Sequence, residues 1–193
     1  MALWGITDAD EAKPKWLSTA QMKEVFANNI GWVVEAGSTM TGNDNADAQP
    51  EVLCCIGDLA TGIGAADITE IEFITTAFDK SDGGNIDVRV RFNEQVTVNT
   101  SGGTPTLTIT NDTPSRNLTA TYLSGSTTNE LIFRKTIAAA NAATNAGDVL
   151  SIGANPLALA SGTIKDTADG TTNATITSVA SIGAAAGTIT VAA

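Results

Sequence analysis

The sequence predicts a mainly β protein in two parts: a C-terminal β-sandwich, preceded by an extended N-terminal arm and a small α+β segment. Aromatic residues are only 5% of the 193 residues, so the core must use Val, Ile, Leu and Ala, which favours short strands. Short segments of alternating apolar and polar residues recur from residue 67 onward. All three tryptophans, by contrast, lie at or before Trp32. The chain therefore changes character after its first sixty or so residues.

Residues 1–17 show no sustained periodicity and predict an extended arm with isolated large apolar side chains. Such an arm cannot bury these side chains by itself and is expected to dock on another surface. We interpret Trp4 and Trp16 as interface anchors, because buried tryptophan is characteristic of binding hot spots. The candidate partner-binding residues are Leu3, Trp4, Lys13, Lys15, Trp16 and Leu17.

The segment after the arm predicts one helix and two strands. Ser18 with Gln21 is a capping-box pattern, and apolar residues at helical spacing follow it, so we expect a helix of about ten residues that ends near 28–29. Residues 31–34 and 51–56 are predicted strands, which form a small hairpin across a polar loop.

The Gly- and Ala-rich run ATGIGAA at 60–66 predicts a linker. We therefore divide the chain into an attachment part, 1–66, and a sandwich part, 67–193. Trp32, on the first strand of the predicted hairpin, is expected in a small local core between the hairpin and the predicted helix.

Short predicted strands separated by Gly, Asn, Asp, Ser and Pro indicate the sandwich part. Residues 86–92 show the clearest period of two, with Ile, Val and Phe alternating with Asp and Arg. Strand spacings of about 10 to 12 residues are typical of a sandwich. The Ala- and Asn-rich stretch 137–146 predicts one or two helical turns. The expected strands are near 68–73, 86–92, 96–98, 107–109, 118–122, 131–133, 149–152, 163–164, 174–176 and 188–191.

The sandwich part resembles a known family. Residues 86–98, 103–109, 120–133 and 162–166 are similar, in order and spacing, to a bacterial immunoglobulin-like repeat of large surface proteins. The similarity covers about half of the chain and departs from the family at 167–173, where the family has a tighter Gly-Asn turn. The resemblance implies an immunoglobulin-like sandwich that acts as a spacer or adhesive module and has no catalytic residues.

The start of the chain resembles a second group. Residues 3–5 (LWG), 8–10 (DAD) and 13–17 (KPKWL) look like the beginning of virion structural proteins of marine tailed phages, including cyanophages. With the appended sandwich, the resemblance implies a decoration protein on the outer capsid surface, made in the host cytoplasm. Its expected partners are the major capsid protein or neighbouring virion proteins, with self-association on the particle as a further option.

Composition argues against several function classes. The net charge is −11 and there is no block of Lys or Arg, which disfavours binding to nucleic acid. Histidine is absent, so the chain alone cannot build a Ser-His-Asp or Cys-His triad. The sequence contains no apolar stretch of about 18 residues, the length that a membrane span requires. We expect no enzyme activity and no cofactor, and two reduced thiols at Cys54 and Cys55.

Three alternatives stay open. Oxygen donors between Asp79 and Asp87 could hold calcium weakly, although a turn with solvated carboxylates is the preferred interpretation. The sandwich could be a glycan- or host-surface-binding adhesin that uses the loops at 111–116 and 124–129. A neck or tail component is the third.

Overall fold

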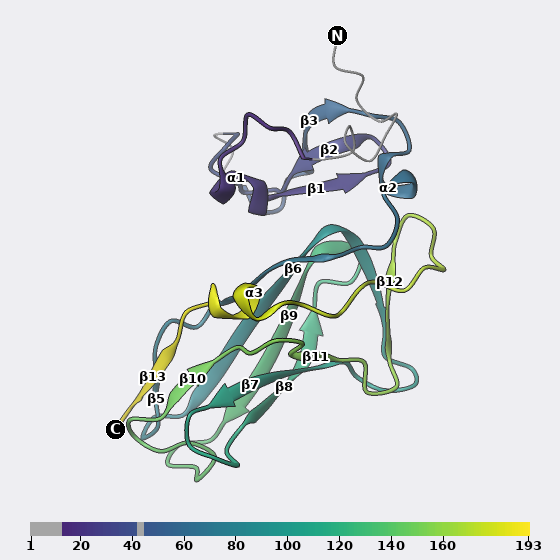
Figure 1. Ribbon diagram of the computed structural model, residues 1–193. Coiled ribbons are helices and arrows are strands. Elements are labelled where there is room, and N and C mark those ends of the chain that lie inside the picture. Colours follow the sequence, from purple (N-terminus) through teal and green to yellow (C-terminus); the bar gives the residue numbers. More distant parts are fainter. Residues whose placement is uncertain (1–12, 42–44) are drawn as a thin grey trace.

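The computed structural model describes residues 13–41 and 45–193 (Figure 1). Strands make up 43% and helices 8% of the structure, so the predicted mainly β class is confirmed. A small unit with helices α1 and α2 lies at one end of a larger body of strands. The C-terminus lies at the opposite end of that body (Figure 1).

The N-terminal unit consists of three short strands and two short helices. In chain order these are α1 (Thr19–Lys23), β1 (Val25–Asn28), β2 (Gly31–Val34), β3 (Glu51–Cys55) and α2 (Leu59–Gly62). Strand β2 pairs antiparallel with both β1 and β3. The pairing of β2 with β3 is the hairpin that the sequence predicts.

Helix α1 is shorter than predicted. The expected capping box is present, since Ser18 Oγ accepts from Gln21 N at 3.3 Å and Gln21 Oε1 accepts from Ser18 N at 2.9 Å. The helix nevertheless ends at Lys23, and Val25 and Phe26 belong to β1. Both side chains are buried, and β-branched and aromatic residues favour a buried strand over a second helical turn.

A tight turn joins β1 to β2 and depends on Gly31. Asn28 Oδ1 accepts hydrogen bonds from Ile30 N at 2.8 Å and from Gly31 N at 3.2 Å. Gly31 has a φ of +145°, and a Cβ added there would collide with the carbonyl oxygen of Cys54 on β3. Only glycine fits this close approach of two strands.

Replacing Gly31 by alanine is expected to destabilise the N-terminal unit by at least about 1–3 kcal/mol, the cost of a strained backbone conformation. Because every tryptophan lies at or before Trp32, the tryptophan fluorescence transition in urea reports this unit. Gly57→Ala is the matched control, since a Cβ at Gly57 meets nothing within 4 Å. Equal midpoints for the two variants would contradict the role given to Gly31.

The predicted linker is partly helical. Leu59 and Ala60 in α2 are buried in the core of the N-terminal unit and Ile63 packs against it, so this unit continues to Ile63. The core of the larger body begins at Ala66, which is fully buried there. The chain thus passes from one core to the other within 64–65.

The larger body contains the remaining strands. They are β4 (Ile68–Phe73), β5 (Phe78–Asp79), β6 (Gly84–Asn99), β7 (Thr106–Asn111), β8 (Leu118–Ser124), β9 (Thr128–Ile137), β10 (Val149–Ser151), β11 (Leu157–Ala158), β12 (Thr163–Asp166) and β13 (Ile189–Ala192), with a helix α3 (Ala180–Ala184). In hydrogen-bonded order the path is β3-β2-β1-β6-β9-β8-β7-β10-β13-β5, with β4 and β12 on β6 and β11 on β7.

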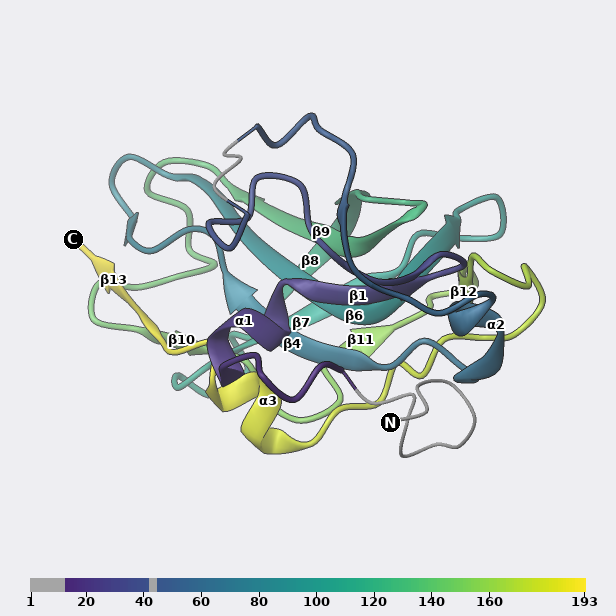
Figure 2. The ribbon, with the colours of Figure 1, turned by 90° about the horizontal axis from the view of Figure 1, so that it is seen from above.

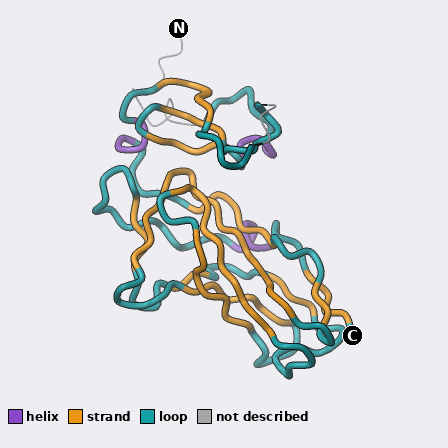
Figure 3. The backbone as a smooth tube through the Cα atoms, turned by 180° about the vertical axis from the view of Figure 1, so that it is seen from behind, coloured by secondary structure: helices purple, strands orange, loops and turns teal. Residues whose placement is uncertain are grey.

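Strand β6 organises the body. Its first half pairs antiparallel with β4 on one side and β9 on the other, and its last residues pair with β12. The two predicted strands at 86–92 and 96–98 are therefore one strand. Seen from behind, the long strands run from the N-terminal unit toward the C-terminus (Figure 3).

The strands enclose one core. Each of the ten strands from β4 to β13 contributes at least one buried side chain to this core. Examples are Phe92, Leu107, Phe133 and Ile189. A second, smaller core holds Trp32 with Leu17, Val25, Ala27 and Val34, as expected for Trp32.

Three local predictions in the C-terminal half differ from the structure. Ile137 ends β9, and residues 138–146 form turns rather than helix, because Ala140 has a positive φ of 54° and Asn141 Oδ1 accepts a hydrogen bond from Ala143 N. Near 174–176 only an isolated bridge forms, from Thr175 to Asp67. Helix α3 lies between the two strands expected at 174–176 and 188–191, where the sequence predicts no helix.

Candidate functional site

The candidate site is the N-terminal unit and its contact with the sandwich. Leu3 and Trp4 lie outside the described residues. The other four candidate residues, Lys13, Lys15, Trp16 and Leu17, fall into two groups: two are held by the unit and two are displayed by it.

A β-turn displays Lys15 and Trp16. Leu17 N donates to the carbonyl of Pro14 at 3.2 Å, so Lys15 and Trp16 are the central residues of the turn. Trp16 is 64% exposed, whereas Leu17 is 7% exposed and packs in the small core. Leu17 therefore fixes one end of the turn, and we call residues 14–17 the anchor turn.

Lys13 fixes the other end of the anchor turn. Its Nζ donates to the carbonyl of Met22 at 2.6 Å. Burial lowers the pKa of Lys13 to about 8, although the nearby carboxylate of Glu35 opposes this shift. Lys13 and Leu17 thus support the turn from within, and Lys15 and Trp16 are the pair that faces outward.

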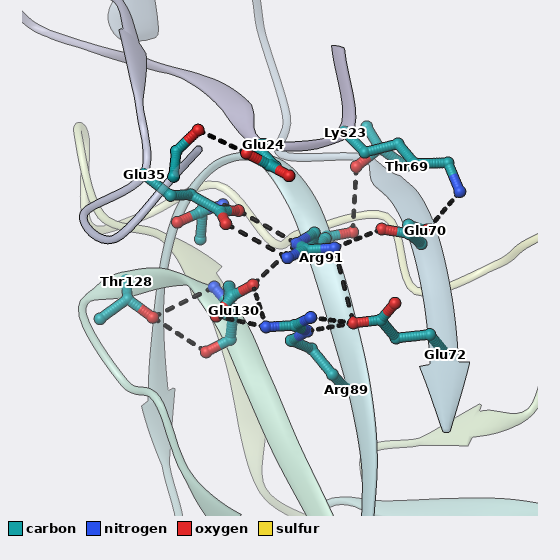
Figure 4. Close-up of polar contacts among 12 residues, drawn as sticks. Lys23, Glu24, Glu35, Thr69, Glu70, Glu72, Arg89, Arg91, Thr128 and Glu130 are labelled. Atoms are coloured by element: carbon teal, nitrogen blue, oxygen red, sulfur yellow. Dashed lines mark hydrogen bonds and ion pairs between the residues drawn. The ribbon is translucent and has the colours of Figure 1, made fainter. Parts of the chain in front are cut away.

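A cluster of charged side chains joins the N-terminal unit to the sandwich (Figure 4). Its centre is Arg91 on β6, whose side chain is 9% exposed. Arg91 binds Glu70 of β4 at 2.5 Å, Glu130 of β9 at 2.7 Å and Glu35 of the N-terminal unit at 3.1 Å. One guanidinium therefore connects three separate parts of the chain, and we call this group the Arg91 cluster.

Further contacts cross the same boundary. Lys23 of α1 forms an ion pair with Glu70, and Asn129 Nδ2 donates to Glu35 at 2.8 Å. On the sandwich side, Arg89 Nε donates to Glu72 at 2.6 Å. A cavity of about 620 Å³ opens beside the cluster and is lined from both units, with Arg91 and Glu35 in its wall.

The electrostatics of the Arg91 cluster depend on burial and pairing. Burial raises the pKa of Glu35, and Glu130 adds to this, while Arg91 and Asn129 act in the opposite direction. Burial alone would raise the pKa of Glu70 as well, but the hydrogen bonds from Lys23 and Arg91 outweigh it and the pKa is lowered. Burial would lower the pKa of Arg91, yet its carboxylate neighbours raise it overall, so Arg91 stays charged.

Sequence reasoning did not identify the Arg91 cluster. In the alternation at 86–92, Arg89 and Arg91 occupy the positions opposite the sandwich core, which predicts solvated side chains. The N-terminal unit covers Arg91 only in the folded chain, where β1 lies over the end of the sandwich near β6 (Figure 2). The available signal was the paired charges, since Glu70 and Glu72 precede Arg89 and Arg91 on neighbouring strands.

The two loops considered for an adhesin do not form one surface. Residues 124–129 lie at the end of the sandwich next to the N-terminal unit, where Asn129 is buried against Glu35. The register places 111–116 at the other end, because Ile109 pairs with Leu118 while β9 begins opposite Val96. A single contact surface made from both loops is excluded by this register.

The oxygen donors between Asp79 and Asp87 have separate partners. Asp79 accepts from Ser81 Oγ at 2.6 Å, Asn85 accepts from Thr136 Oγ1 at 2.7 Å, and Asp87 pairs with Arg134 at 2.6 Å. Within 13–41 and 45–193, no group of three or more Cys, Asp or Glu side chains is arranged to hold a metal ion. Cys54 and Cys55 are both free thiols, as expected for neighbours on a strand.

Comparison of the chain with known protein families, curated proteins and solved structures found no match. No helix in the described part of the chain is long and apolar enough to cross a membrane.

Proposed function

We propose that the chain is a non-enzymatic structural protein on the outer capsid surface of a tailed-phage virion. The N-terminal unit binds the major capsid protein or a neighbouring virion protein, and the sandwich projects from it. The observation that carries this proposal is the anchor turn, because a tryptophan that is 64% exposed is held there by buried flanking residues. Exposed aromatic side chains on a supported turn are suited to binding hot spots.

The distribution of exposed apolar side chains supports attachment through the N-terminal unit. Trp16, Ile30 and Val52 are the large exposed apolar residues within 13–41 and 45–66, and the much longer sandwich has Ile74, Leu123 and Val179. The smaller unit therefore displays more apolar surface for its size. Singly exposed residues on the sandwich are ordinary for a soluble surface.

The Arg91 cluster supports the projecting role. Ion pairs and hydrogen bonds from Glu35 and Lys23 reach the sandwich at several points, so a bound N-terminal unit holds the sandwich in a fixed orientation. Many copies on one particle would add modest interfaces into strong overall attachment. The mutual repulsion of chains with a net charge of −11 favours their spacing over the surface.

Replacing Trp16 by alanine is expected to weaken binding to particles assembled without the chain by about 30-fold, the loss typical of one hot-spot tryptophan. Co-sedimentation of purified chain with such particles measures it. Ile74→Ala is the matched control, since Ile74 is an exposed apolar residue of the sandwich at 47%. The urea midpoint of the remaining tryptophan fluorescence must equal that of the wild type, which shows that the N-terminal unit is still folded. Equal binding by the Trp16→Ala and Ile74→Ala variants would contradict the proposal.

The role of Leu3 and Trp4 is tested by deleting residues 1–12, not the whole predicted arm, 1–17. Removing 1–17 would take away Leu17 and with it part of the small core. Removing 1–12 leaves Lys13 and the anchor turn in place. We expect this deletion to weaken particle binding further in the Trp16→Ala background and to leave sandwich melting unchanged.

A further inference from the structure

Two carboxyl groups are buried close together where the N-terminal unit meets the sandwich, since Asp166 pairs with Val96 and Glu94 lies two residues earlier on β6. Glu94 of β6 is 0% exposed and Asp166 at the end of β12 is 2% exposed. Neither side-chain oxygen of Glu94 receives a hydrogen bond from the described residues. A buried carboxylate without a donor or a cation is strongly disfavoured, so this pair requires an explanation.

The pair lies at the seam between the two units. Glu94 is the β6 residue that pairs with Ala27 of β1, the one ladder contact between the N-terminal strands and the sandwich in the described residues. Asp166 accepts a hydrogen bond from Ala168 N at 2.6 Å, and Ala168 packs on the N-terminal core. Asp166 also lines a cavity of about 260 Å³ together with Asn28 of the N-terminal unit.

The charged surroundings of Glu94 are acidic on every side. Asp166 comes from β12, Asp169 from the turn that follows it, and Asp67 from the residue before β4. Strand β1 (VFAN) and helix α2 (LATG) bring no titratable side chain, and Asp58 before α2 is exposed. Relief of the buried charge therefore has to come from a proton.

Asp166 is the acceptor for that proton. Burial raises the pKa of Glu94 to about 8, and the negative charge of Asp166 adds to the shift. Burial also raises the pKa of Asp166, but the hydrogen bond from Ala168 N opposes this shift and favours the ionised form of Asp166. The arrangement matches a neutral Glu94 that donates to an ionised Asp166.

We propose that Glu94 and Asp166 share one proton and act as a pH-sensitive latch, which holds the N-terminal unit on the sandwich and weakens when the proton is lost. The proposal is independent of what the N-terminal unit binds. Loss of the proton leaves two buried negative charges at the seam where β1 pairs with β6, and opening of this seam lets water reach them.

The direction of the pH effect follows from linkage. Glu94 has its usual pKa of 4.5 in the unfolded chain and a raised pKa of about 8 in the folded chain. Between these values the folded state holds more protons than the unfolded state, so stability falls as pH rises and levels off above about pH 8. Glu94→Gln imitates the protonated side chain and removes this dependence.

Two probes separate the units in the experiment. Tryptophan fluorescence reports the N-terminal unit, since all tryptophans lie at or before Trp32, and far-UV circular dichroism reports mainly the strands of the sandwich. We would record thermal unfolding by both probes between about pH 6 and about pH 9. The chains are wild type, Glu94→Gln, Asp166→Asn and, as an exposed carboxylate control, Glu51→Gln.

We expect the wild-type fluorescence midpoint to fall by about 5 °C relative to that of Glu94→Gln over this range, and to separate from the circular dichroism midpoint. Asp166→Asn should reduce the fall, and Glu51→Gln should behave as wild type. Parallel curves for wild type and Glu94→Gln would overturn the latch, since a merely structural role shifts stability equally at every pH. If millimolar calcium restores the fluorescence midpoint of the wild type at pH 9 but has no effect on Glu94→Gln, the pair is a cation site and the latch is overturned.

Discussion

Replacing Arg91 by methionine is expected to lower the free energy of unfolding by about 3–5 kcal/mol, the usual cost of removing one partner from a buried ion pair. Methionine keeps much of the side-chain volume but leaves Glu35 and Glu70 without their central cation. Because these carboxylates belong to different units, both the fluorescence and the circular dichroism transitions should move to lower urea concentration.

Arg134→Met is the matched control for this variant. Arg134 also lies on a strand and pairs with a carboxylate, Asp87, but its side chain is 37% exposed, so its removal should change stability little. Adding Glu35→Gln to Arg91→Met should restore part of the loss, because the double variant no longer buries that unpaired charge. A loss no larger than that of Arg134→Met would show that Arg91 does not hold the units together.

Replacing Phe133 by alanine is expected to lower the free energy of unfolding of the sandwich by about 3–5 kcal/mol. Phe133 is fully buried on β9, and its ring meets that of Tyr122 edge to face with centroids 6.0 Å apart. The variant leaves a cavity between strands that cannot collapse without shifting β6 and β8. The urea midpoint by far-UV circular dichroism measures this loss.

Leu123→Ala is the control for Phe133→Ala. Leu123 follows Tyr122 on β8 but is 48% exposed, so its truncation should cost far less. If the two variants unfold at the same urea concentration, the core assigned to the sandwich is wrong.

The sandwich strands were predictable because their chemistry is local. The alternation at 86–92 specifies both the strand and the face that enters the core, and Ile86, Val88 and Val90 are all fully buried. The capping box at Ser18 is local in the same way and is confirmed. Patterns of this kind depend only on backbone period and near neighbours.

The remaining features depend on contacts between distant residues. The spacing of Met22, Val25 and Phe26 fits one face of a helix, yet burial on both faces of β1 decides for a strand. The alternation of β6 predicts a solvated Arg91, but in the fold the N-terminal unit covers Arg91 and Glu35 pairs with it. Glu94 likewise interrupts the apolar face of β6, and no local pattern indicates that Asp166 meets it.

The candidate site was predictable only in part. The isolation of Trp16 in a polar stretch predicts an interface anchor; the structure shows its side chain exposed on the anchor turn, and the anchoring role stays a prediction. Leu17 and Lys13 belong to the same stretch, but tertiary contacts with the small core and with the Met22 carbonyl draw them inward. The sequence contained no signal that separates these neighbours.

The proposal that the N-terminal unit attaches the chain to a capsid, with the sandwich projecting, is tested most directly by a cryo-EM map of the intact particle. We predict repeated copies on the outer shell, with the anchor turn and Trp16 against the shell protein and the C-terminal end of the sandwich pointing outward. Density for the chain only in the neck or tail, or copies bound to the shell through the sandwich, would contradict the account.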